Sequence, residues 1–180
     1  MLQLICHKEA PAVTVETIGV VAERREDGGL WLRFHVEGRL DELELGEPKL
    51  SERTDELWKT TCFEAFVRKS DEASYVEYNF APSSQWAAYA FLDYRSGCAD
   101  LDVTRAPEIL LDASEGHFAM ETEITLPADW QNESIELNLT AIIEETGGTK
   151  SYWALAHPPG KPDFHHKDCF ALKLEAPTAP

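Results

Sequence analysis

Apolar and polar residues alternate with a period of two along most of this chain. The alternation is clearest in residues 62–67 and 75–80, where every second side chain would lie on the same face of an extended strand. The pattern also predicts strands at residues 13–16, 31–36, 86–91, 118–124, 135–143, 152–156 and 170–174. Only two short windows, residues 51–57 and 128–131, favour helix. Many short strands of this kind predict an all-β protein, a single antiparallel β-sandwich of the jelly-roll type.

Turn-forming residues separate the predicted strands. Glycine, proline, serine and aspartate gather at residues 27–29, 46–48, 81–84 and 147–148. No repeat or low-complexity linker interrupts this order, and 180 residues suffice for one substantial core. We therefore expect one domain over residues 1–175, followed by a flexible tail over residues 176–180.

Strand register decides which side chains share a face. If Gly147 and Gly148 form a two-residue hairpin turn, then Trp153 and His157 lie on the same sheet face as Asn138. A slip of one residue would move each of these side chains to the opposite face.

A second hairpin leads to a similar expectation. Its register places Glu64 opposite Asn79, and Asn79 opposite Trp86, in one row across three strands. On the same face as Trp86 lie only Ala88 and Ala90, which would leave room for a groove.

These faces predict a site for a sugar-like ligand. Tryptophan rings offer flat platforms for the C–H face of a sugar ring, and polar side chains offer directional hydrogen bonds to its hydroxyl groups. The stacking residues would be Trp58, Trp86 and Trp153, and the polar ligand-binding residues would be Glu64, Asn79, His157, Lys161 and His165. The alternative is that the tryptophans only pack in the core, as aromatic residues commonly do in sandwiches. If the site hypothesis is correct, Trp153→Ala abolishes binding and leaves the fold intact.

Composition narrows the classes of partner and the compartment. The net charge of −17 disfavours nucleic acid and anionic membrane surfaces, and we interpret this acidity as an aid to solubility. The first residues do not resemble a signal peptide, and no apolar run is long enough to span a bilayer. The four cysteines are scattered without a disulfide framework, which is typical of reduced thiols in a cytoplasmic protein.

Metal and haem sites have weak support. His157, His165 and His166 lack the spacing of a known zinc motif, so we expect no metal site there. A histidine of this loop and Met120 are conceivable haem ligands, but Met120 lies in an alternating strand where a core role is the better interpretation. The carboxylates of residues 41–44 are the one conceivable structural Ca²⁺ site.

Catalysis has little support either. Glu64 and Glu77 lie on neighbouring strands, as the two carboxylates of a glycoside hydrolase would, although both are also compatible with solvated surface positions. The chain has no nucleophile elbow and no phosphate loop, and we assign no catalytic residue.

Three blocks of the sequence resemble a known family. Residues 57–66, 78–89 and 151–165 are similar to the DOMON-like family of bacterial proteins, and the resemblance extends over nearly the whole chain. That family is similar in turn to family 9 carbohydrate-binding modules and to DOMON domains, which are β-sandwiches that hold a sugar or a haem on one sheet. The resemblance implies a non-catalytic ligand-binding fold. By position, Trp58, Glu64 and Trp153 match the aromatic and acidic residues of the sugar-binding modules.

Taken together, the sequence predicts a non-catalytic β-sandwich that binds a saccharide or polyol in an aromatic-lined groove. Three alternatives stay open: a haem-binding electron-transfer module, a glycan-active enzyme that uses Glu64, and a protein interaction module. We expect no cofactor, with haem or structural Ca²⁺ as the exceptions to test. The oligomeric state is left open.

Overall fold

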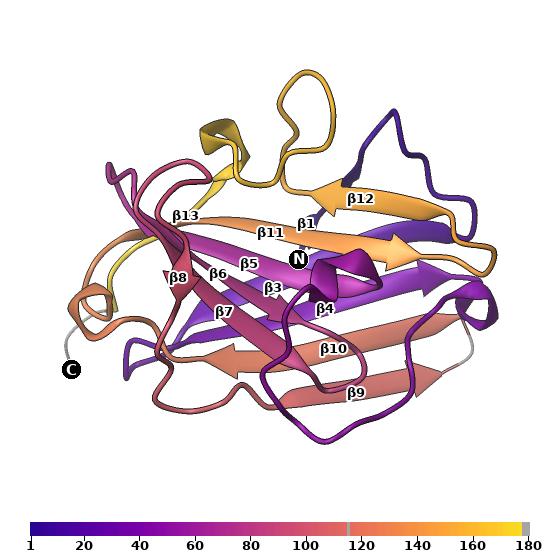
Figure 1. The fold of residues 1–180 in the computed structure, drawn as a ribbon, viewed down its shortest axis with the longest axis horizontal. Coiled ribbons are helices and arrows are strands. Elements are labelled where there is room, and N and C mark those ends of the chain that lie inside the picture. Colours follow the sequence, from indigo (N-terminus) through magenta and orange to yellow (C-terminus); the bar gives the residue numbers. More distant parts are fainter. Residues whose placement is uncertain (115, 178–180) are drawn as a thin grey trace.

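The chain folds as a sandwich of two antiparallel β-sheets (Figure 1). The computed structural model describes residues 1–114 and 116–177. The first sheet has the strand order β1 (Leu2–Gln3), β3 (Val15–Arg24), β4 (Leu30–Gly38), β10 (His117–Ile124) and β9 (Ile109–Ser114). The second sheet has the order β2 (Ile5–Cys6), β12 (Lys150–Ala154), β11 (Ile135–Glu144), β5 (Cys62–Lys69), β6 (Tyr75–Phe80), β7 (Trp86–Phe91) and β8 (Ala99–Asp100), with β13 (Leu172–Leu174) also paired to β11. The predicted all-β sandwich is confirmed.

The core lies between the two sheets. Alternate residues of β4 and β5 point into it, and the ring centroids of Phe34 and Phe63 are 5.0 Å apart. Phe118 of β10 packs against the other side of Phe63, at 6.1 Å. Removal of this apolar surface from water is the main force that stabilises the sandwich.

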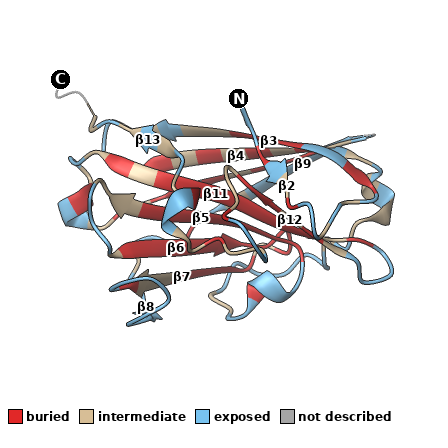
Figure 2. Ribbon diagram, turned by 90° about the horizontal axis from the view of Figure 1, so that it is seen from above, coloured by how far each residue is buried: buried red, intermediate tan, exposed pale blue. Residues whose placement is uncertain are grey.

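The central strands of the second sheet are buried on both faces, as the red of β6 and of most of β5 in Figure 2 shows. An antiparallel sheet in a sandwich usually leaves one face to solvent. Here the chain between β12 and β13 covers part of the outer face, including the short 3-10 helix Lys167–Cys169. The side-chain amide of Asn138 donates a hydrogen bond of 2.9 Å to the carbonyl of Phe164 and so fixes this covering segment to β11.

Most predicted strands are present, and the differences have local causes. The expected helical windows contain only the 3-10 turns Leu57–Lys59 and Ala128–Trp130, and the described residues hold no α-helix. The pattern did not predict β1, β2, β8 or β9, which are short or largely exposed. No helix of the described chain is long and apolar enough to cross a membrane. Of the expected tail, residues 178–180 lie outside the described residues.

One predicted register is confirmed: Glu64 of β5 lies opposite Asn79 of β6. The register between β11 and β12 was wrong by one residue. The backbone N–H of Glu145 bonds to the carbonyl of Thr149 at 2.8 Å, so the hairpin loop has three residues, 146–148, and not two. Trp153 therefore lies opposite Ala141, and its side chain points into the core, where it is 5% exposed.

The register between β6 and β7 was wrong by one residue for the same reason. The N–H of Ala81 bonds to the carbonyl of Gln85 at 2.9 Å, which encloses another three-residue loop. Phe80 and not Asn79 lies opposite Trp86, and Trp86 packs in the core at 7% exposure. The alanines that share its face, residues 88 and 90, pack against the core as well and form no groove.

Candidate functional site

The outer face of the second sheet carries a cavity of about 500 Å³. Strands β5, β6, β7, β11 and β12 form its floor and walls, and the segments 92–98 and 157–168 lie over its rim. Six aromatic side chains line it: Trp58, Phe66, Tyr89, Phe91, Tyr152 and Phe164. Cavities with aromatic walls and a few placed polar groups are the usual form of a small-molecule site.

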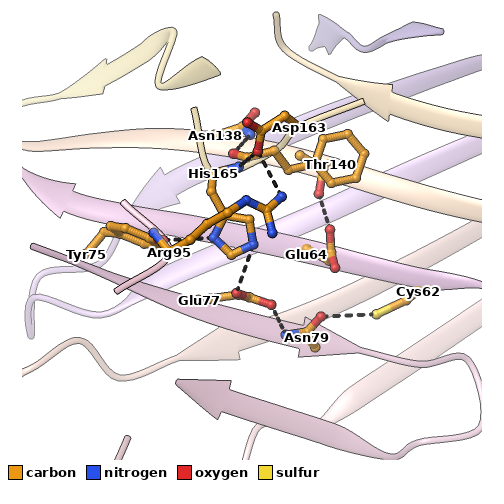
Figure 3. Close-up of polar contacts among 11 residues, drawn as sticks. Cys62, Glu64, Tyr75, Glu77, Asn79, Arg95, Asn138, Thr140, Asp163 and His165 are labelled. Carbon is orange, nitrogen blue, oxygen red and sulfur yellow. Dashed lines mark hydrogen bonds and ion pairs between the residues drawn. The ribbon is translucent and has the colours of Figure 1, made fainter. Parts of the chain in front are cut away.

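Two buried carboxyl groups face this cavity from neighbouring strands (Figure 3). Glu64 lies opposite Asn79, and Glu77 lies opposite Phe66, so the two glutamates are diagonal neighbours on one sheet face. Only 2% of Glu64 and 6% of Glu77 is exposed, so neither is the solvated surface carboxylate that the sequence also allowed.

Each carboxyl group accepts a hydrogen bond from another side chain, Glu64 from the neighbouring strand β11 and Glu77 from its own strand β6. The Thr140 hydroxyl donates to Oε2 of Glu64 at 2.7 Å, and the Asn79 amide donates to Oε1 of Glu77 at 2.7 Å. Sγ of Cys62 donates to Oδ1 of Asn79 at 3.5 Å, which turns the amide nitrogen toward Glu77. These contacts hold both carboxyl groups in fixed orientations.

The environment of the two glutamates favours their protonated forms. Burial raises the pKa of Glu64 to about 8, and the nearby charge of Glu77 adds to the effect. Burial also raises the pKa of Glu77. The two carboxyl groups are diagonal neighbours on one sheet face, so their titrations are coupled.

His165 lies between the carboxyl pair and Tyr75. Its Nδ1 is 2.8 Å from Oη of Tyr75, and its Nε2 is 3.8 Å from Oε2 of Glu77. Burial, followed by the charge of Arg95, lowers the pKa of His165 to about 4, so the ring is neutral at neutral pH. The Tyr75 oxygen also accepts a hydrogen bond of 3.2 Å from the backbone N–H of Arg95.

Asp163 ties together the two segments at the rim. Its carboxylate accepts hydrogen bonds from Arg95 at 2.9 Å, from the Tyr94 hydroxyl at 2.6 Å and from the backbone of His165 at 3.3 Å. Burial opposes ionisation of Asp163, but the bonds from Tyr94 and Arg95 outweigh it, and its pKa is lowered. Arg95 itself has a left-handed backbone, with φ of 50°, which is uncommon for a residue with a side chain.

The structure brings together only some of the predicted ligand-binding residues. Trp58, Glu64 and His165 line the cavity, with Trp58 half exposed at the rim. Asn79 is buried behind it and acts on Glu77. The prediction that Trp86 and Trp153 face the site was wrong, since both belong to the core.

The other two predicted residues lie outside the cavity. His157 places Nε2 2.7 Å from the carbonyl of Ile5 and packs edge-on against His7, with 4.8 Å between ring centroids. Lys161 is exposed and lines an adjoining hollow with Tyr94 and His166. The structure therefore does not place Trp153 and His157 together in a wall of the cavity.

The pattern missed several lining residues. Tyr152 and Tyr89 occupy the face on which the sequence placed Trp153 and Trp86, and recognition of three-residue hairpin loops would have found both. Arg95 follows no periodic pattern, because its position depends on contacts with Tyr75 and Asp163, which are distant in sequence.

The positions of the candidate ligands bear on the two cofactor hypotheses, haem and a metal ion. Met120 is fully buried in the core between the sheets and faces away from the cavity, so it cannot pair with a loop histidine as an axial haem ligand there. Among the described residues, no three His, Cys, Asp or Glu side chains are arranged to hold a metal ion, and this includes the carboxylates of residues 41–44.

Comparison with known proteins supports the fold. No protein-family model matches the chain, and no curated protein matches it. A solved structure described as a "putative carbohydrate-binding protein from Bacteroides uniformis" is similar, with a TM-score of 0.69 at 13% sequence identity. The similarity covers 93% of this chain and 82% of the other. At this identity it shows a shared sandwich fold alone, and the resemblance to the DOMON-like family stays a prediction.

Proposed function

We propose that this protein binds a small saccharide in the cavity on the outer face of the second sheet, without turning it over. One observation carries the proposal: flat aromatic rings and two fixed, buried carboxyl groups line the same cavity of about 500 Å³. Aromatic rings suit the C–H faces of a sugar, and the carboxyl groups suit its hydroxyl groups. The carbohydrate-binding description of the Bacteroides uniformis protein is consistent with this proposal.

The affinity is expected to be modest. Among the described residues, the charged or titratable polar groups of the cavity wall are few: Glu64, Glu77, Arg95 and His165, besides the tyrosine hydroxyls, the Cys98 thiol and the Trp58 indole N–H. Sites of this kind commonly bind with a Kd of roughly 10 μM to 1 mM, which corresponds to about −4 to −7 kcal/mol.

The carboxyl pair also favours a second candidate function, a glycan-active enzyme. The raised pKa of Glu64 would keep it protonated as a general acid, and Glu77 would be the second carboxylate. This hypothesis requires turnover of a glycoside by the wild-type protein and its loss in Glu64→Gln. If the protein binds sugars without any turnover, the enzyme hypothesis is wrong and the binding function stands.

A ligand screen tests the proposed function directly. Bound sugar should raise the melting temperature in a concentration-dependent manner, because ligand that binds only the folded state stabilises it by mass action. Haem and divalent ions belong in the same screen. A Soret band on haem-loaded protein, or stabilisation by an ion and by no sugar, would contradict the proposal.

Trp58→Ala is expected to weaken sugar binding about three- to tenfold, since a stacked aromatic contact is worth roughly 0.5–1.5 kcal/mol. The Trp58 side chain is 48% exposed, so the free energy of unfolding should change little. Isothermal titration calorimetry measures the first effect and urea unfolding the second. Trp31→Ala, on the other sheet, is the matched control. Equal loss of affinity in both variants would mean that Trp58 does not contact the ligand.

A further inference from the structure

The carboxyl pair of the cavity lacks a positively charged partner. Among the described residues, no lysine or arginine nitrogen lies within 4.0 Å of the carboxyl oxygens of Glu64 or Glu77. Glu77 accepts a hydrogen bond from the Asn79 amide, and Nε2 of His165 lies 3.8 Å from its carboxyl group. A buried negative charge without a paired cation destabilises the folded state. A protein tolerates this destabilisation only where another interaction offsets it.

Neither of the two nearest basic residues forms a close ion pair with the glutamates, although the charge of Arg95 acts against burial and lowers the pKa of both. His165 is neutral at neutral pH because of its burial. The Arg95 guanidinium forms its ion pair with Asp163, at 2.9 Å, on the rim side of the cavity. When either glutamate ionises, its negative charge therefore lies in the cavity wall without an ion-pair partner of its own among the described lysine and arginine side chains.

The walls favour a cation as well. The faces of aromatic rings carry negative electrostatic potential and attract ammonium groups within about 6 Å of their centroids, most strongly where water is excluded. Phe66 of β5 lies directly opposite Glu77 of β6, and Tyr89 of β7 lies opposite Glu77 on its other side. A group that reaches Glu77 thus lies between aromatic neighbours on both adjacent strands.

We propose that the saccharide bound in this cavity carries a protonated amine, and that its ammonium group is received by Glu64 and Glu77 between the surrounding aromatic rings. This inference rests on the proposed saccharide-binding function and names its ligand class, an amino sugar. The ammonium supplies the charge that the described side chains do not. A neutral sugar leaves that charge uncompensated, and an N-acetylated sugar adds bulk without charge.

The wild-type protein tests this inference without any substitution. Isothermal titration calorimetry at about pH 6.5 and low salt compares glucosamine, glucose and N-acetylglucosamine, with choline as a cation that is not a sugar. We expect glucosamine to bind at least tenfold more tightly than either neutral sugar. Equal affinities for glucosamine and glucose would overturn the amine inference and leave the saccharide function standing. Binding of choline with no binding of any sugar would overturn both proposals, as would no binding of any of the four.

A charge-removing variant locates the recognition. Glu77→Gln keeps the shape of the side chain and removes its charge, so the preference for glucosamine over glucose should fall from at least tenfold to less than about threefold. Glu16→Gln, an exposed position of β3 on the other sheet, removes the same unit of charge far from the cavity and should leave the preference unchanged. A preference that persists in Glu77→Gln, or that disappears in Glu16→Gln, would contradict recognition by the pair.

Discussion

Trp153→Ala is expected to destabilise the protein by about 3–5 kcal/mol, the usual cost of truncating a buried tryptophan to alanine. The Trp153 side chain is 5% exposed in the core, and its indole N–H donates to the Ser151 hydroxyl at 2.9 Å. Truncation would leave a cavity between the sheets and an orphaned hydroxyl. Urea unfolding followed by tryptophan fluorescence or circular dichroism measures the loss. This outcome is the opposite of the one that the sequence pattern predicted for Trp153.

The neighbouring residue provides the matched control. Tyr152 lies on the opposite face of β12, lines the cavity and packs near Phe164, with 6.2 Å between ring centroids. Tyr152→Ala should cost less stability and should weaken ligand binding. If Trp153→Ala leaves stability unchanged and abolishes binding, the register between β11 and β12 described above is wrong.

Glu64→Gln is expected to stabilise the protein at alkaline pH and to have little effect below about pH 4.5. Its pKa is raised from 4.5 to about 8 in the folded state, so the folded protein retains a proton that the unfolded chain loses between these values. Stability therefore falls as the pH rises through this window, and it falls because a charged Glu64 is disfavoured by burial. Glutamine never ionises, so it escapes this loss, which is on the order of 5 kcal/mol once Glu64 is ionised.

The difference in unfolding free energy between wild type and variant should be measured at about pH 4, 6 and 8.5. Subtraction removes the contribution of the groups that titrate identically in both proteins. A gain that increases with pH supports the buried, protonated state of Glu64. A constant difference across the range would show that Glu64 has an ordinary pKa in the folded protein.

The sequence predicted the fold better than the site. Alternation alone identified the central strands, because each has one face in a continuous core, as in Phe63 and Val67 of β5. The pattern did not predict strand β9, because its residues are mostly exposed and do not alternate. The two-residue strands exist only through pairing with distant partners, which a local pattern cannot contain.

The site errors have one physical cause. Both hairpins that were misjudged have three-residue loops whose last residue, Ser84 or Gly148, has a left-handed backbone, with φ of 75° and 84°. Such loops shift the register by one residue relative to a two-residue turn. Because of that shift, the sequence pattern placed two tryptophans of the core where the structure has two tyrosines of the cavity. The pair Glu64 and Asn79 was placed correctly because its hairpin was aligned from the strand pattern itself.

Alternate positions in the central strands of the second sheet have different roles. In β5, Phe63, Ala65 and Val67 serve the core, whereas Glu64 and Phe66 face the cavity. Substitution at the cavity-facing positions changes what the ligand meets without removing a side chain from between the sheets. Ligand preference can therefore diverge between descendants of such a chain, or be redesigned in the laboratory, while the sandwich that carries the site is inherited unchanged.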